Sequence, residues 1–320
     1  MRDVLADKIQ ECVVVGAGIM GAGIAQNFAQ AGIHVSLVDQ ENEVLNGCLS
    51  QIDANLKLFS EFGLVDEDVS TIKNRITPCL AEDLTQVMDR CDFLVEAIPE
   101  ILELKKDLFG QLDSLPRHVI LASNTSSFTI TSIAEGLQNP GRIVGLHYFN
   151  PAHIIPAVEI HRGKHTSEDT VNVTRELMLR VGKKPIIVQK TVPGFIINRL
   201  TGAMEREIDY LIDNGIVTPE DLDTAVKASY GFRLACLGPM EAEDMIGLDT
   251  SARVSERMFK VLSNSTEPSP KLLEKVDKGE LGIKSGKGWY DYTGRNREEV
   301  AEKINRRLLK QLALFKSVEG

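Results

Sequence analysis

Short apolar runs and longer amphipathic stretches alternate along the first 190 residues. The short runs, rich in β-branched side chains, occupy residues 12–15, 34–38, 75–79, 92–97, 118–123, 142–148, 156–160 and 185–189. Between them, apolar residues recur at three- and four-residue intervals over 19–31, 41–62, 67–74, 82–89, 103–114 and 167–181. An entirely apolar run such as 12–15 is typical of a parallel sheet that helices cover on both faces. The alternation therefore predicts an α/β fold with a doubly wound, mostly parallel sheet.

The pattern changes near residues 191–194. From Phe195 onwards only helical periodicity is found, and it predicts helices over 196–214, 219–229, 241–262 and 296–315. Gly215 is placed to end the first of them, while Thr218 is placed to cap the second, with Pro219 at its first position. We therefore expect two domains, a nucleotide-binding domain over residues 1–190 and an all-α domain over residues 191–320.

The first strand runs directly into three glycines with the spacing G-x-G-x-x-G. They are Gly16, Gly18 and Gly21, and a helix of small and apolar residues follows. This arrangement lets the chain turn tightly, approach a pyrophosphate closely and pack the helix against the strand. The partial positive charge at the helix start also suits a diphosphate. Glycine triplets occur in ordinary turns as well, but the strand–glycine–helix order favours a Rossmann-type nucleotide-binding unit.

An acidic residue at the end of the second strand indicates which nucleotide is bound. Asp39 lies eighteen residues beyond Gly21, where a carboxylate can accept hydrogen bonds from the ribose hydroxyls of an adenosine. The carboxylate would repel a 2′-phosphate, and no Arg or Lys occurs in the next dozen residues to bind one. We therefore expect the cofactor to be NAD. The residues expected to bind it in this region are Gly16, Gly18, Ile19, Met20, Gly21 and Asp39.

Composition narrows the class of protein further. The chain has 320 residues, 26% of them charged, and its net charge of −10 disfavours nucleic acid or an anionic membrane as a partner. No apolar run reaches the roughly eighteen residues of a membrane span, and residues 1–10 lack the apolar core of a signal peptide. The five cysteines are scattered and odd in number. We therefore expect reduced thiols in the cytoplasm, with neither disulfides nor a metal site.

Polar residues stand at or near the ends of three of the predicted strands. Residues 122–127 read ASNTSS, residues 147–151 read HYFNP, and Glu159 interrupts the apolar run at 156–160. Ligands of open α/β sheets bind at the carboxyl ends of the strands. A buried carboxylate needs a partner, and a histidine held by Glu159 would be oriented and made more basic, as a general base requires. His147 is the obvious candidate. The alternatives are a structural histidine and a glutamate that faces solvent, and the spacing does not decide between them.

Several ordered motifs resemble those of the L-3-hydroxyacyl-CoA dehydrogenase family. They are GAGIMGAGIA, VEAIPE, ASNTSS, GLHYFNP, VEI, VPGFIINR, GPMEAEDMIGLDT and GIKSGKGWYDY, and together they extend over nearly the whole chain. The resemblance implies an NAD-dependent oxidation of a 3-hydroxyl group and a role in fatty acid metabolism. It also implies that the helical second domain forms a homodimer.

The same resemblance implies roles for individual residues. His147 would be the catalytic base, Glu159 would orient it, and Ser126 and Asn198 would contact the substrate. Further residues are expected to contact the cofactor, chiefly its nicotinamide half: Glu100, Lys105, Asn150 and Lys284.

The substrate is harder to assign, because the chain departs from the acyl-CoA members in two places. Those members carry a Lys-rich helix that faces the CoA phosphates, whereas the helix predicted at 41–62 has one basic residue, Lys57. The segments YFNPAHIIPAVEI and Gly231–Arg233 resemble relatives that act on small 3-hydroxy acids or alcohols. These are L-gulonate 3-dehydrogenase (lambda-crystallin), carnitine dehydrogenase and a pyridine-carboxylate dehydrogenase. Arg233 would then pair with a substrate carboxylate, the alternative being a solvated charge.

Two other segments, SNTSS and SGKGWYDY, are those of the acyl-CoA members. We therefore expect a short-chain L-3-hydroxyacyl-CoA as the substrate, with a small free hydroxy acid or alcohol as the alternative. A non-catalytic crystallin-like protein and an NAD-sensing module are further alternatives. The presence of both His147 and Glu159 disfavours them.

Overall fold

The computed structural model describes residues 6–116 and 118–319. Residues 1–5, half of the N-terminal segment considered above, lie outside the described residues. Contacts within the chain divide it into two compact units, residues 1–196 with 305–320, and residues 197–304. The end of the C-terminal helix thus groups with the first unit, whereas the sequence pattern assigned it to the second domain.

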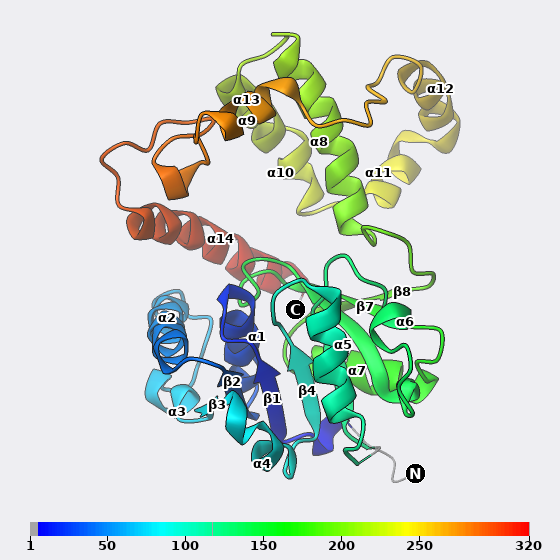
Figure 1. Cartoon of the computed structure of the whole chain (residues 1–320). Helices are drawn as coiled ribbons and strands as arrows, with labels where there is room; N and C mark the ends of the chain where they lie inside the picture. Colours follow the sequence, from blue (N-terminus) through cyan, green and yellow to red (C-terminus); the bar gives the residue numbers. More distant parts are fainter. Residues whose placement is uncertain (1–5, 117, 320) are drawn as a thin grey trace. The chain divides into compact units, whose positions relative to one another are not determined.

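The first unit is built on an eight-stranded sheet (Figure 1). Its strands are β1 (Glu11–Val15), β2 (His34–Asp39), β3 (Ile76–Leu80), β4 (Phe93–Glu96), β5 (Ile120–Ser123), β6 (Ile143–Tyr148), β7 (Ala157–Arg162) and β8 (Lys184–Val188). Their spatial order is β3-β2-β1-β4-β5-β6-β7-β8. All neighbouring strands pair in parallel except β6 and β7. The Rossmann-type, mostly parallel sheet is therefore confirmed.

The antiparallel pair β6–β7 follows from its short connection. Residues 149–156 join the two strands, too few for the crossover helix that a parallel pair needs. The register places His147 opposite Glu159 and Gly145 opposite His161. Because opposed residues of an antiparallel pair face the same side of the sheet, these four positions form one patch.

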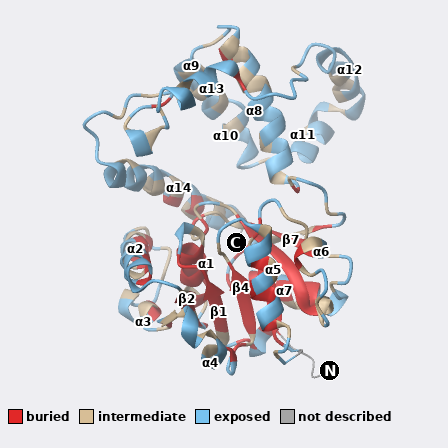
Figure 2. Ribbon diagram, in the orientation of Figure 1, coloured by how far each residue is buried: buried red, intermediate tan, exposed pale blue. Residues whose placement is uncertain are grey.

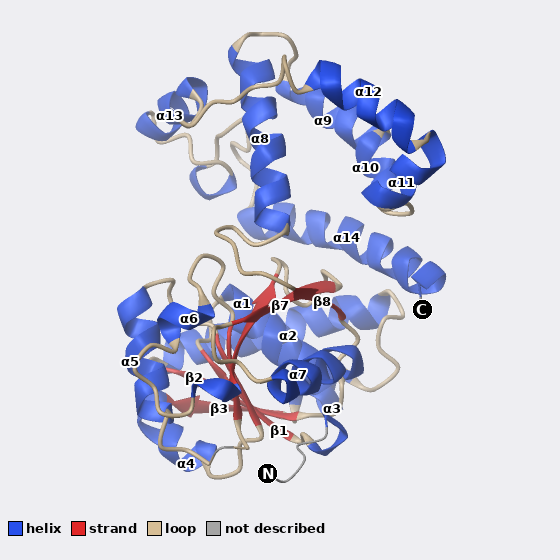
Figure 3. Cartoon of the chain, turned by 90° about the vertical axis from the view of Figure 1, so that its right-hand side faces the viewer, coloured by secondary structure: helices blue, strands red, loops and turns tan. Residues whose placement is uncertain are grey.

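Helices cover both faces of this sheet (Figure 3). One face packs against α1 (Ile19–Gln30), α2 (Asn42–Glu61), α3 (Val69–Lys73) and α7 (Glu168–Arg180). The other packs against α4 (Leu84–Met88), α5 (Leu102–Leu112) and α6 (Ile130–Ile133). Short 3₁₀ helices occur at Ala6–Lys8, Ala81–Asp83 and Pro140–Arg142. The central strands are buried on both sides (Figure 2), as their apolar sequences require.

The final helix, α14 (Arg297–Glu319), contributes its C-terminal part to the first unit. Its Leu309 and Leu312 are buried in a small cluster with Phe59 of α2 and with Ile154. Arg306 also pairs with Glu61 of α2, with 2.9 Å between Nη2 and Oε2. This part of α14 therefore covers the end of α2, the helix that follows β2.

The second unit is helical, as expected, but its helices are shorter than the sequence pattern predicts. They are α8 (Ile197–Asp213), α9 (Pro219–Ala228), α10 (Tyr230–Leu234), α11 (Pro239–Ile246), α12 (Leu248–Met258) and α13 (Pro270–Asp277), with a 3₁₀ turn at Ile283–Ser285. The prediction of one helix over 241–262 is wrong. Gly247 adopts a φ of 97°, which no helix tolerates, and separates α11 from α12. The cap at Thr218 is confirmed, since its side chain accepts the amide of Asp221.

The second unit has almost no core of its own. Within residues 197–304, all of which the structure describes, only Ile212, Ser269 and Gly288 are buried. In the described part of the chain, no helix combines the length and apolarity that would let it cross a membrane.

Candidate active site

The glycine loop between β1 and α1 has the geometry of a nucleotide-binding turn. Gly16 adopts a φ of 105°, and a Cβ there would lie 2.5 Å from the carbonyl oxygen of Ala97. A Cβ on Gly21 would lie 1.8 Å from the carbonyl oxygen of Gly16. At Gly18 a Cβ would meet nothing within 4 Å, so this position opens onto free space. Two glycines therefore allow the turn and the packing, and the third leaves room for a ligand.

The start of α1 and the end of β2 complete this part of the site. No side chain caps α1, so the positive end of its dipole is available to an anion. The Asp39 carboxylate is fixed by two backbone amides, those of Ala17 and Gln40, at 2.7 Å each. Ile19 in the first turn is 71% exposed. The free space at Gly18, the uncapped start of α1 and the fixed carboxylate of Asp39 are what the predicted contacts with a pyrophosphate and a ribose require, and these contacts stay predictions.

A buried network of charges joins the end of β4 to α5. Lys105 Nζ lies 2.6 Å from Glu96 Oε1 and 3.1 Å from Glu100 Oε2, and both Lys105 and Glu96 are almost fully buried. Ser123 at the end of β5 donates its hydroxyl to Glu96. Burial raises the pKa of Glu96, against the lowering effects of Lys105 and of these hydrogen bonds. The ammonium of Lys105 is thus held between two carboxylates.

Glu100 organises the polar loop after β5. Its Oε1 accepts the hydroxyls of Thr125 and Ser127 at 2.6 and 2.7 Å, and the amides of Ser126 and Ser127 at 2.9 Å each. Burial alone would raise the pKa of Glu100, but the hydrogen bonds from Thr125 and Ser127 and the charge of Lys105 lower it to about 2. Glu100 is therefore an anion that fixes the backbone of Ser126, whose side chain is exposed.

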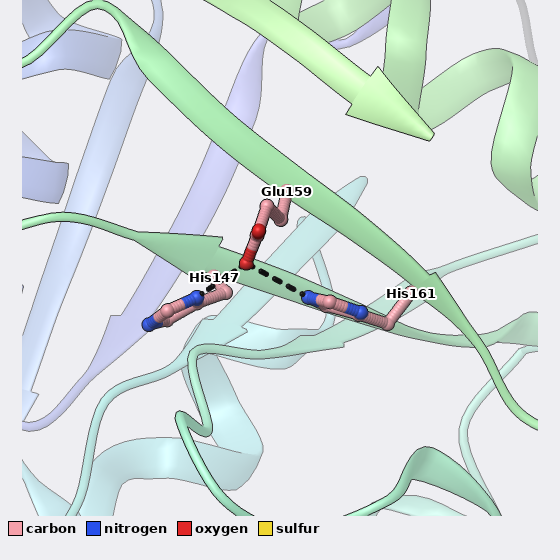
Figure 4. Close-up of side chains that lie close together, drawn as sticks. All are labelled: His147, Glu159 and His161. Carbon is pink, nitrogen blue, oxygen red and sulfur yellow. Dashed lines mark hydrogen bonds and ion pairs between the residues drawn. The ribbon is translucent and has the colours of Figure 1, made fainter. Parts of the chain in front are cut away.

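His147 and Glu159 lie together, as their opposed positions on β6 and β7 require (Figure 4). His147 Nδ1 is 2.9 Å from Glu159 Oε2, and both residues are buried. The second oxygen of Glu159 accepts the amide of Ile196 at 3.1 Å. A carboxylate on Nδ1 favours the tautomer that carries its proton there, so Nε2 is left to accept a proton. This is the arrangement that general-base catalysis needs.

Two buried residues beside this pair were not predicted from the sequence. His161 Nε2 lies 3.5 Å from Glu159 Oε2. The Phe195 ring is 3.7 Å from the His161 ring and 5.5 Å from the His147 ring, centroid to centroid. Nothing in its local sequence marked His161, because a single histidine at a strand end resembles a surface residue. The signal that was available is its alternation with Glu159, which places both side chains on one face of β7.

The remaining predicted residues lie in the connection after β6 and in the second unit. Asn150 is exposed in the connection after β6. Asn198 lies in the first turn of α8, Arg233 in α10 and Lys284 in the 3₁₀ turn at Ile283–Ser285, all within the second unit. Their contacts with substrate or cofactor stay predictions.

The cations on and beside α2 are already paired. Lys57, the single basic residue of α2, lies 2.6 Å from Asp53. Asp53 also binds Lys73 at 2.7 Å, and Arg306 binds Glu61. Within the fully described length of α2, Lys57 and Lys73 thus share the carboxylate of Asp53, and Arg306 has that of Glu61.

Both units match families of known function. Residues 11–192 match the family described as 3-hydroxyacyl-CoA dehydrogenase, NAD binding domain, and residues 194–292 match 3-hydroxyacyl-CoA dehydrogenase, C-terminal domain. The helix α14 begins beyond the second match.

Individual relatives differ in what they act on. The chain is 33% identical over 313 residues to 5-formyl-3-hydroxy-2-methylpyridine 4-carboxylate 5-dehydrogenase of Mesorhizobium japonicum, covering 98% of this chain and 99% of the relative. It is 37% identical over 288 residues to a probable 3-hydroxybutyryl-CoA dehydrogenase of Bacillus subtilis, covering 89% and 98%. Among solved structures, the NAD⁺-dependent 5-formyl-3-hydroxy-2-methylpyridine 4-carboxylic acid 5-dehydrogenase superposes with a TM-score of 0.88 at 32% identity, covering 96% and 99%.

Proposed function

This chain belongs to the 3-hydroxyacyl-CoA dehydrogenase family and is an NAD-dependent oxidoreductase that acts on a CH–OH group, and we propose that His147 is its general base. The observation that carries this proposal is the buried 2.9 Å contact between His147 Nδ1 and Glu159 Oε2. A purely binding or structural protein has no need of a buried acid–imidazole pair, which is costly unless it is used.

In the proposed reaction, Nε2 of His147 takes the proton of a secondary hydroxyl. NAD⁺ supplies the acceptor for the hydride that leaves the same carbon, so the products are a ketone, NADH and a proton on His147. Glu159 stabilises the imidazolium that forms, because its carboxylate is already anchored by the amide of Ile196. Ser126 and Asn198 are proposed to hold the reacting oxygen. Reduction of the ketone requires the opposite proton flow.

We propose that two charged residues, Glu100 and Lys105, fix the conformation of the loop after β5. Glu100 holds the amides of Ser126 and Ser127, and Lys105 holds Glu100. We therefore assign Glu100 and Lys105 to the positioning of this loop and of the nicotinamide half beside it. Asn150 and Lys284 are proposed as further cofactor contacts.

For the substrate, we propose a small free hydroxy acid in preference to a CoA thioester. The sequence motifs alone favoured the thioester, but the charges on α2 argue the other way. A CoA carries several phosphate charges, and Lys57 is paired with Asp53 while α14 covers the end of α2. The similarity to a pyridine-carboxylate dehydrogenase, which is 33% identical and covers 98% of this chain, supports the same choice. Arg233 is the proposed partner of the substrate carboxylate.

The second candidate is a short-chain L-3-hydroxyacyl-CoA. It is favoured by the 37% identity to a probable 3-hydroxybutyryl-CoA dehydrogenase and by the loop 122–127, whose motif resembles that of acyl-CoA members.

A substrate panel separates the two candidates. NADH formation at 340 nm is measured with NAD and either 3-hydroxybutyryl-CoA or the free compounds 3-hydroxybutyrate, gulonate and carnitine. We expect at least one free compound to exceed the thioester in kcat/KM by tenfold or more. Arg233→Met should then lower kcat/KM for that acid about 100-fold through loss of one charge-assisted contact, whereas Arg253→Met on exposed α12 should not. Turnover of the thioester alone would overturn the substrate proposal.

We also propose that the protein is a homodimer joined through the second unit, which cannot bury its apolar residues alone. The cytoplasm remains the proposed location, in keeping with five free cysteines, three of them buried.

A further inference from the structure

Glu159 lies between two imidazoles (Figure 4). Its Oε2 is 2.9 Å from Nδ1 of His147 on one side and 3.5 Å from Nε2 of His161 on the other. His161 is 1% exposed, and neither of its ring nitrogens makes a hydrogen bond within the described residues. A buried imidazole that makes no hydrogen bond is costly, so a role for it is expected.

The packing around His161 holds its ring in this position. Opposite it on β6 is Gly145, where a Cβ would lie 2.8 Å from the Cβ of His161. The absence of a side chain there makes room for the ring. Phe195, itself buried with a φ of 52°, packs against the His161 ring at 3.7 Å between ring centroids, with the ring planes tilted by 33°. A bulky residue rarely adopts that backbone conformation, so the contacts around Phe195 must hold it there.

The surroundings also determine the charge of His161. Burial lowers its pKa, and His147 lowers it further, while Glu159 opposes both. Among the described residues, two titratable groups face His161: Glu159 from its own strand, β7, and His147 from β6. Phe195 after β8 supplies an apolar contact. At neutral pH His161 is therefore a neutral ring with a single N–H to donate.

We propose that His161 is a positioning residue for the reaction, whose Nε2–H shares Glu159 Oε2 with His147. The two atoms lie 3.5 Å apart, so a small shift of either side chain brings them within hydrogen-bond distance. It keeps Glu159 in place and draws part of its negative charge away from His147. The imidazolium of His147 is then less strongly stabilised, so His147 returns to its neutral, base-competent form at lower pH. The inference rests on the proposed role of His147.

The first test follows the protonation of His147 directly. Protein with ¹³C-labelled histidine is saturated with NAD in EDTA, and the six histidine signals are titrated by NMR, with His147→Ala identifying the signal of interest. EDTA is included because the ligand atoms of His147, Glu159 and His161 lie close enough together to hold a metal ion. We expect His161→Leu to move the His147 midpoint to higher pH by about half a unit to one unit, and His161→Gln, which keeps an N–H, to restore it.

The second test uses turnover. In His161→Leu, the acid limb of kcat/KM for alcohol oxidation should move to higher pH by the same amount, with KM for NAD unchanged. His153→Leu removes a half-buried ring on the other face of the sheet and should leave the profile as it is. An unchanged profile and an unchanged His147 midpoint in His161→Leu would overturn the inference. If His147→Ala itself retains turnover, the proposed base is wrong, and the NMR titration still reports whether His161 acts on it.

Discussion

His147 and Glu159 are direct cross-strand partners, and their side chains meet at 2.9 Å because β6 and β7 run antiparallel. Every other neighbouring pair of strands in the sheet is parallel. The one antiparallel pair is therefore the pair that carries the acid and the imidazole. The connection of residues 149–156 is what enforces the reversal.

The first prediction concerns the base itself. His147→Ala should lower kcat by about three orders of magnitude, within the range that general-base catalysis contributes, because the group proposed to take the proton is removed. NAD affinity, measured by fluorescence titration with NADH, should change less than threefold. Glu159→Gln should lose about 100-fold in kcat, because an amide can hold the ring but cannot stabilise its charge. Near-normal turnover in His147→Ala would contradict the assignment.

The glycine loop offers a pair of substitutions with opposite consequences. Gly18→Ala places a methyl group in open space, so the protein should fold with an unchanged Tm but bind NADH at least tenfold more weakly. Gly21→Ala places the methyl 1.8 Å from a backbone carbonyl and should prevent stable folding. Circular dichroism melts and NADH titration of the two proteins separate these outcomes. A normal affinity in Gly18→Ala would show that the pyrophosphate lies elsewhere.

Asp39 is expected to select NAD over NADP. Asp39→Ala should weaken NAD binding about tenfold to 100-fold and narrow the preference over NADP, because the repulsion of a 2′-phosphate is removed. The substitution also removes the carboxylate that accepts hydrogen bonds from the amides of Ala17 and Gln40, so a small decrease in Tm is expected. Asp66→Ala, on a carboxylate in the loop between α2 and α3, is the matched control and should leave both affinities unchanged. Equal affinities for NAD in Asp39→Ala and the wild type would refute the role.

The parallel sheet and the cofactor could be predicted from sequence because their signals are local. A β-branched run, three glycines and an acid lie within residues 12–39, and each has one physical reason to be there. His161 could not be predicted, because its role depends on register. Only the pairing of β6 with β7 puts it beside Glu159 and opposite Gly145.

The break at Gly247 was missed for a related reason. An isolated glycine within an amphipathic pattern is tolerated in a helix at modest cost, and the sequence does not show that Gly247 adopts a positive φ. The sequence shows that Lys57 is the single basic residue of α2, but it does not show that Lys57 pairs with Asp53.

Acid should weaken the loop after β5 through Glu100. The pKa of Glu100 is lowered to about 2, so the carboxylate stabilises the fold above its unfolded pKa near 4.5, and this stability is lost as pH falls towards 2. The side chain is one-third exposed, so we discount the full linkage and expect Glu100→Gln to cost about 1–2 kcal/mol at pH 7. Urea unfolding should show that the free energies of unfolding of variant and wild type differ less at pH 3.5 than at pH 7. Glu135→Gln, an exposed partner of Lys106, is the control.

The exposed apolar side chains of the second unit predict how the protein assembles. Only three residues of 197–304 are buried, while α10 to α12 and the segment after them expose large apolar side chains such as Phe232, Met245 and Phe259, at 77, 76 and 74%. A unit of this size without a core is not stable alone, so we predict that a second copy of the chain covers these side chains.

Light scattering should therefore give a dimer mass, and the Tm should rise with protein concentration. Phe259→Glu should shift the protein towards monomer and lower the Tm, because a charge would have to be buried at the interface. Lys260→Glu, a charge change on the next residue at a solvent-exposed position, should leave the mass unchanged. A wild-type protein that is monomeric at micromolar concentration with a concentration-independent Tm would exclude the dimer.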